Sequence, residues 1–193
     1  MDRNKMKQLQ KLGPFKLAHA RSMGISHQQL SQLVKEEKIL RMQRGVYLHP
    51  QAKITDEISF KIAYQRIGKD SAIGGLSALF YYHIIDQVPR QTWVLVPPTK
   101  RTSSKRFRLI RTKTSLTHGI IEGDGYRIVS RERAIAEAFK LAPKIGERTA
   151  IHACRIAIQE KQTTIKKIGL MAEELGIESS FRKYFEAIMG ALQ

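Results

Sequence analysis

The segment RMQRGVYLHP, residues 41–50, constrains this chain most, because it predicts a hairpin that cannot fold by itself. Two short runs of alternating apolar residues, 40–42 and 46–48, flank the pair Arg44-Gly45. This pattern is typical of a β-hairpin. An isolated two-stranded hairpin is only marginally stable in water. The hairpin must therefore pack against structure formed by the preceding residues.

Helices are predicted before the hairpin. Apolar residues recur at helical spacing over 6–12, and Gly13-Pro14 stops this first helix. A second helix is predicted to begin at Phe15 and to end at Gly24, since glycine readily takes the left-handed conformation that closes a helix. These two helices supply part of the surface that the hairpin needs.

The third predicted helix spans 27–37. Ser26 is expected to cap it, because Gln29 follows three residues later in a capping-box pattern. Two helices joined by a turn containing glycine describe a helix-turn-helix. The arginine-tipped hairpin that follows is then predicted to be a wing, so residues 1–50 form a winged helix-turn-helix.

The outward face of the third helix carries side chains that can contact DNA. With Leu30 and Leu33 buried, a rotation of about 100° per residue points Gln28, Gln32 and Lys35 outward. A glutamine amide can pair with adenine in the major groove. The predicted DNA-binding residues are Ser26, His27, Gln28, Ser31, Gln32, Lys35, Arg41, Arg44 and Tyr47.

Other interpretations of these residues stay open. Tyr47 either anchors the hairpin or contacts the DNA backbone. In a purely structural alternative, the third helix is a solvated amphipathic helix and the hairpin is a structural cap.

The charge of the whole chain favours a polyanionic partner. Thirty-four Lys and Arg against 17 Asp and Glu give a net charge of +17 and a pI of about 10.2. Such a balance suits nucleic acid or an anionic membrane surface. No apolar run approaches the roughly 20 residues that span a bilayer, and no signal peptide is recognisable. We therefore expect a cytoplasmic protein with no membrane partner.

A domain boundary is predicted at Pro50-Gln51, which gives domains 1–50 and 51–193. Thr55 is expected to cap a helix that ends at Ile67. Strands and helices then alternate, with a hairpin turn at 122–125, until Ser130 caps the first helix of a helical tail. The predicted fold class is α+β: an N-terminal winged helix-turn-helix, a mixed α/β domain, and helices from about residue 130.

Residues 100–113, KRTSSKRFRLIRTK, contain seven basic residues and no acid. Alternation with apolar residues predicts a strand with one cationic face. This strand is either a second nucleic-acid contact or an edge strand that charge protects from aggregation. The basic residues are Lys100, Arg101, Lys105, Arg106, Arg108, Arg111 and Lys113.

No pattern in the sequence predicts catalysis, so we expect no catalytic residue, metal ion or cofactor. Glu122 and Asp124 are the closest acid pair, but they lie in a turn that favours Asp and Gly. Cys154, the single cysteine, excludes a disulfide within the chain and a cysteine zinc cluster. Its neighbour His152 diverges from it by about 200° around a helix, so the two form no dyad.

The order of these parts resembles the AbiEi family of antitoxins from type IV toxin–antitoxin systems. The resemblance rests on LVKEEKILRMQRGVYLHP, on LSALFYYHI followed by VPRQTWVLVPP, and on SRERAIAEAF, and it covers nearly the whole chain. SRERAIAEAF departs from the commoner pattern, in which an aspartate follows the arginine by a few residues; Glu137 is the candidate substitute. The DNA contacts of the family would map onto His27, Gln28, Gln32, Lys35, Arg41 and Arg44.

The resemblance implies a transcriptional repressor that binds inverted repeats in its own promoter. It also implies that the C-terminal domain opposes a nucleotidyltransferase toxin encoded beside it, without a stable complex. Two alternatives remain: an RNA-binding or nuclease-accessory protein that uses the basic strand, and a transcription regulator without a toxin.

Overall fold

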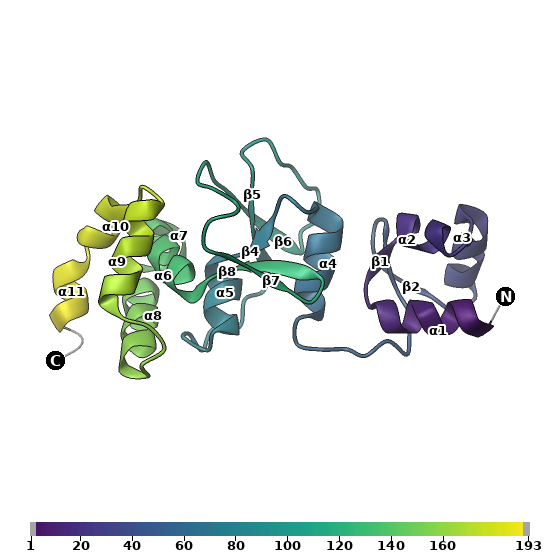
Figure 1. Cartoon of the computed structure of the whole chain (residues 1–193), viewed down its shortest axis with the longest axis horizontal. Helices are drawn as coiled ribbons and strands as arrows, with labels where there is room; N and C mark the ends of the chain where they lie inside the picture. The colour runs from purple at the N-terminus through teal and green to yellow at the C-terminus, as the bar shows by residue number, and fades with distance from the viewer. Residues whose placement is uncertain (1–2, 191–193) are drawn as a thin grey trace. The chain divides into compact units, whose positions relative to one another are not determined.

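The computed structural model describes residues 3–190 and separates into two compact units. Of the described residues, 3–69 and 124–126 form the first unit, and 70–123 and 127–190 form the second. Helices and strands are mixed in both units (Figure 1), so the predicted α+β class is confirmed.

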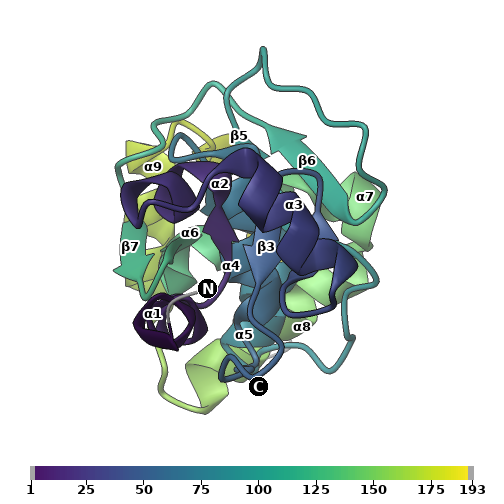
Figure 2. The same cartoon turned by 90° about the vertical axis from the view of Figure 1, so that its right-hand side faces the viewer.

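The first unit contains three helices and a small antiparallel sheet, followed by a fourth helix. Its elements are α1 (Arg3–Leu12), β1 (Phe15–Lys16), α2 (Leu17–Ser22), α3 (His27–Lys35), β2 (Leu40–Gln43), β3 (Val46–Leu48) and α4 (Ile58–Ile67). The sheet order is β1-β3-β2. Figure 2 shows α2 and α3 side by side, joined by the turn that contains Gly24. The predicted helix order and hairpin are confirmed.

The second predicted helix is wrong at its start. Phe15 and Lys16 form a short strand, and the helix begins at Leu17. Phe15 pairs with Tyr47 and Lys16 with Val46 on β3. A third strand gives the hairpin hydrogen bonds that two strands lack, and it places the fully buried Phe15 ring 5.9 Å from the Tyr47 ring.

The core of the first unit draws on every helix of its N-terminal part. Leu9 of α1, Ala20 of α2 and Leu30 of α3 are buried together with Phe15 and Ile39. Tyr47 of the hairpin packs against this cluster. The hairpin is thus stabilised by the helices, as its small size requires.

The cap predicted for α4 is wrong. The helix begins at Ile58, and the residue before it, Glu57, makes no capping side-chain bond. Thr55 lies in a preceding turn, in which the Ile58 amide donates to its carbonyl at 3.0 Å. The Thr55 Oγ1 is buried and has no hydrogen-bond partner.

The second unit is built on a five-stranded sheet of order β6-β5-β4-β8-β7. Its strands are β4 (Ala72–Ile73), β5 (Thr92–Val96), β6 (Phe107–Arg111), β7 (Ile120–Gly123) and β8 (Tyr126–Val129), and α5 (Gly75–Tyr81) follows β4. β5 and β6 are parallel, and β6 is an edge strand. A Cβ added at Gly74 would collide with the Leu95 side chain, so the glycine lets the β4–α5 junction approach β5 closely.

The helical tail begins where predicted. Ser130 caps α6, and its Oγ accepts a hydrogen bond from the Arg133 amide at 3.2 Å. Helices α6 (Arg131–Lys140), α7 (Ala142–Ile145), α8 (Glu147–Gln159), α9 (Ile165–Glu174), α10 (Glu178–Arg182) and α11 (Phe185–Gly190) follow. Figure 1 shows them gathered beside the sheet of the second unit. No helix within residues 3–190 is long and apolar enough to cross a membrane.

Candidate nucleic-acid interface

Helix α3 presents the polar face that its sequence predicts. Leu30 and Leu33 are buried, while Gln28, Gln32 and Lys35 are exposed. His27 and Ser26 are also exposed, and Ser31 is half-buried. The helix therefore offers hydrogen-bonding side chains to solvent along one side.

A reciprocal cap holds the start of α3. The Gln29 amide donates to the Ser26 Oγ at 3.2 Å, and the Ser26 amide donates to the Gln29 Oε1 at 2.8 Å. The predicted capping box is confirmed. Ser26 thus caps the start of α3, and the exposed polar residues of the helix follow directly after it.

The two glutamines of α3 differ in their surroundings. The Gln32 Nε2 donates to the Glu36 Oε1 at 2.9 Å, and Glu36 also pairs with the Lys38 ammonium at 2.7 Å. The Lys38 hydrogen bond, followed by the Gln32 bond, lowers the pKa of the Glu36 carboxyl. Gln28 makes no side-chain hydrogen bond within the described part of the chain. The Gln28 amide is therefore available to a ligand, whereas the Gln32 amide must first leave Glu36.

The hairpin places two arginines in solvent. Arg41 lies on β2 opposite Tyr47, and Arg44 lies in the turn before Gly45. Gly45 has φ +78°, a conformation that favours glycine. Arg41 and Arg44 have no carboxylate partner within residues 3–190. Their guanidinium groups are free to meet phosphate.

Several basic side chains of the predicted cationic strand already have partners within the protein. On β6, Arg108 lies over the Trp93 ring at 5.8 Å, and the Arg111 Nε donates to the Lys100 carbonyl at 3.1 Å. Arg101 donates to the carbonyls of Pro98 and Lys100. Arg101 and Arg111 therefore brace the loop before β6, whereas Arg108 contacts β5. Arg108 and Arg111 also lie on opposite faces of the strand, because their numbers differ by an odd step.

The exposed charges that remain on this segment are Lys105, Arg106 and Lys113. The edge position of β6 fits charge protection of an open strand. The same three exposed cations fit a nucleic-acid backbone.

Sequence reasoning missed a buried ionic network at the start of α6. Arg133 is fully buried and pairs with Glu137 at 3.0 Å. Its Nη1 donates to the Ser115 carbonyl at 2.7 Å and to the His118 carbonyl, and its Nη2 donates to the Thr114 Oγ1 at 3.1 Å. Burial raises the pKa of the Glu137 carboxyl, although Arg133 opposes the shift. The Glu137 carboxylate therefore lies beside the buried charge of Arg133, and the Arg133 guanidinium group holds segment 114–118 by hydrogen bonds.

The acid pair and the cysteine that were considered for chemistry are ion-paired or buried. Asp124 pairs with Lys61 at 2.6 Å, and Glu122 pairs with Arg127 at 2.8 Å. Cys154 is buried, and burial raises the pKa of its thiol to about 12. No group of three or more His, Cys, Asp or Glu that could hold a metal occurs between residues 3 and 190.

Comparison with known families places the N-terminal segment. Residues 5–50 match a family described as a transcriptional regulator, AbiEi antitoxin. The resemblance is thus confirmed for the part of the chain that contains α1 to β3. No curated protein matches the chain.

Proposed function

We propose that this protein is a DNA-binding antitoxin that represses its own promoter in a type IV toxin–antitoxin system. The observation that carries the proposal is the exposed polar face of α3 together with two exposed arginines of the hairpin that have no carboxylate partner within residues 3–190. Both lie inside the segment that is similar to AbiEi transcriptional regulators. The protein would work by binding, in the cytoplasm, and without catalysis.

In this proposal α3 enters the major groove and the hairpin acts as a wing. Gln28 reads a base through its amide, and Gln32 joins it after exchanging its bond to Glu36. Lys35, Arg41 and Arg44 meet phosphates or the minor groove, which positions the helix without reading sequence. Inverted repeats in the promoter would offer each recognition helix an equivalent half-site.

The second part of the proposal concerns the toxin. The separate core of the second unit supports a distinct role for it. We propose that this unit opposes a nucleotidyltransferase toxin encoded beside the antitoxin, without forming a stable complex with it. DNA binding and toxin antagonism would then be separable functions of one chain.

A gel-shift titration tests the DNA-binding part. The full chain is titrated with its upstream promoter fragment, with a scrambled fragment of equal length, and with single-stranded RNA. At physiological salt the promoter should bind at least about a thousandfold more tightly than the scrambled duplex. Gln28→Ala should weaken promoter binding while sparing the scrambled fragment. Equal affinity for both duplexes would refute operator recognition, and tighter binding to RNA than to the promoter would favour the RNA-binding alternative.

A rescue assay tests the antitoxin part. The full chain and the variant Gln28→Ala/Arg44→Ala are expressed from an unrelated promoter together with the neighbouring toxin. Both should rescue growth, whereas only the wild type should repress a reporter under the native promoter. Loss of rescue in the folded variant would show that antagonism acts through DNA binding.

A further inference from the structure

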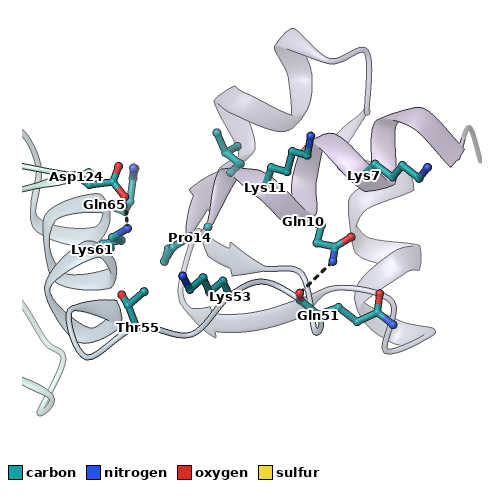
Figure 3. A pocket seen from close by; sticks show the side chains of 13 residues that line it. Lys7, Gln10, Lys11, Pro14, Gln51, Lys53, Thr55, Lys61, Gln65 and Asp124 are labelled. Atoms are coloured by element: carbon teal, nitrogen blue, oxygen red, sulfur yellow. Dashed lines mark hydrogen bonds and ion pairs between the residues drawn. The ribbon is translucent and has the colours of Figure 1, made fainter.

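The first unit contains an open pocket of about 780 Å³ that DNA recognition by α3 does not use (Figure 3). Its walls come from α1, the connecting segment after β3, α4, and the turn between β7 and β8. The volume lies within the range of about 300–1,000 Å³ that is usual for small-molecule sites.

Four lysines line this pocket. Lys7 and Lys11 are one helical turn apart on α1, Lys53 lies in the connecting segment, and Lys61 lies on α4. Residues at this spacing share one face of a helix. Figure 3 shows that these side chains come from three different parts of the chain: α1, the connecting segment and α4. The positive charge is thus a property of the folded unit and not of a single basic run.

One carboxylate opposes this charge. The Asp124 Oδ2 accepts from the Lys61 Nζ at 2.6 Å, a bond that lowers the pKa of Asp124. The Lys61 side chain is only 18% exposed, against 95% for Asp124, so the pair fixes Lys61 at the α4 wall. Lys7, Lys11 and Lys53 have no carboxylate partner anywhere in residues 3–190. Most of the charge in the pocket is therefore not neutralised.

The uncharged lining combines polar side chains with the apolar Leu12 and Pro14 and contains no aromatic ring. Gln10, Gln65 and Thr55 contribute amide and hydroxyl groups. Gln10 Nε2 donates to the Gln51 carbonyl at 3.2 Å, whereas the Thr55 Oγ1 is buried without a partner. Ammonium, amide and hydroxyl donors suit a ligand with many acceptor oxygens. A nucleobase would find no ring to stack on.

We propose that this pocket binds a small oligophosphate through its phosphate chain. Three unneutralised ammonium groups and a fourth shared with Asp124 match the several negative charges of a triphosphate better than those of a single phosphate. The ligand is either inorganic tripolyphosphate or the phosphate chain of a nucleoside triphosphate. A concave pocket fits such a ligand, whereas a duplex presents a convex backbone. The site does not depend on operator binding by α3.

Calorimetric titration of the full chain tests the proposal at about 0.15 M salt, where surface charges are screened beyond roughly 8 Å. The ligands are inorganic tripolyphosphate, ATP and adenosine. Tripolyphosphate and ATP should bind with similar affinity at one site per chain, and adenosine should not bind. A much tighter affinity for ATP would show base recognition and overturn the assignment to the phosphate chain.

Two double variants distinguish ligand binding in the pocket from attraction by the overall positive charge of the protein. Lys7→Gln/Lys53→Gln should weaken tripolyphosphate binding by at least about tenfold, because two charge-assisted contacts are lost. Lys140→Gln/Lys166→Gln removes the same charge from exposed positions on α6 and α9 and should change the affinity less than about twofold.

Three results would overturn the proposal. Tripolyphosphate could fail to bind saturably, or both double variants could lose affinity equally, as for diffuse charge attraction. Alternatively, Lys7→Gln/Lys53→Gln could weaken duplex binding while tripolyphosphate binds neither protein, which would make the pocket a DNA-backbone contact. Operator binding by the wild type, measured separately, reports on the proposed function and not on this site.

Discussion

Replacing Glu137 by leucine should destabilise the second unit strongly, because it leaves the Arg133 cation buried without a counter-charge. The Arg133 side chain is fully buried and that of Glu137 is 7% exposed, so water cannot replace the missing carboxylate. Removing one partner of such a pair typically costs about 3–5 kcal/mol. We expect Glu137→Leu to lower the free energy of unfolding by that amount.

The reverse change should cost less. Arg133→Met removes the cation, and Glu137 can then hold a proton, since burial already raises its pKa. The change leaves the carbonyls of Ser115 and His118 without a donor, but both residues are exposed, so water can reach them. Each of the two carbonyls should therefore cost about 1 kcal/mol, which is the low end of the range for an unmade hydrogen bond. We expect a total loss of about 2–3 kcal/mol.

The double variant provides the decisive comparison. Arg133→Met/Glu137→Leu contains no buried charge, so it should be destabilised only by about 2–3 kcal/mol and be more stable than Glu137→Leu alone. Urea unfolding at pH 7 measures all three. Trp93, the single tryptophan, lies on β5 of the second unit, so its fluorescence reports on this unit.

Glu173→Leu provides a matched control on α9. The same substitution is made there at an exposed side chain that has no partner within residues 3–190, and it should change the free energy of unfolding by less than about 0.5 kcal/mol. The reasoning fails if Glu137→Leu costs less than about 1 kcal/mol. It also fails if the double variant is less stable than Glu137→Leu, because burial of an uncompensated cation would then not be the dominant cost.

Three further predictions concern the DNA interface and the buried thiol. Arg44→Ala should weaken binding to all duplexes and reduce the slope of log affinity against log salt by about 1 if one phosphate contact is lost; an unchanged slope in a salt titration would remove Arg44 from the interface. Glu36→Ala frees the Gln32 amide and should tighten promoter binding by about two- to fivefold, as measured by fluorescence anisotropy. Glu37→Ala is the control: it removes the same charge without releasing Gln32, so its effect on promoter binding should be smaller. Cys154 keeps its proton to about pH 12 when folded, so unfolding releases that proton above the ordinary thiol pKa of about 8.5 and stability should fall as pH rises. Urea titrations should show a loss of about 2 kcal/mol between pH 8 and pH 10 that is absent in Cys154→Ala, and identical pH profiles would contradict this.

Local patterns were sufficient to predict most helices, the hairpin and the exposed face of α3. The capping box of Ser26 and Gln29 joins residues three apart, so sequence spacing alone specifies its geometry. The turn at Gly45 is similarly local. The periodicity of Leu30 and Leu33 identifies the buried side of a helix whatever it packs against.

Features that depend on distant partners could not be predicted in this way. Phe15 and Lys16 form a strand only because β3 lies beside them, and a two-residue strand has no periodicity of its own. The turn containing Thr55 replaces the expected cap, although Thr55 itself is a good capping residue. For residues 15 and 16, pairing with β3 overrides the local preference for helix.

The sequence by itself determined which side chains of α3 and the hairpin turn are polar and face outward, because helical periodicity and turn chemistry operate over a few residues. Only the tertiary structure decided how free those side chains are, and which charges become buried. The spacing of Arg133 and Glu137 suggests a pair on one helix face, but the carbonyls of segment 114–118 that complete the network come from a different part of the chain. Likewise, the lysines of α1, the connecting segment and α4 become one cationic pocket only when the chain folds, since charge density depends on distance in space and not along the sequence.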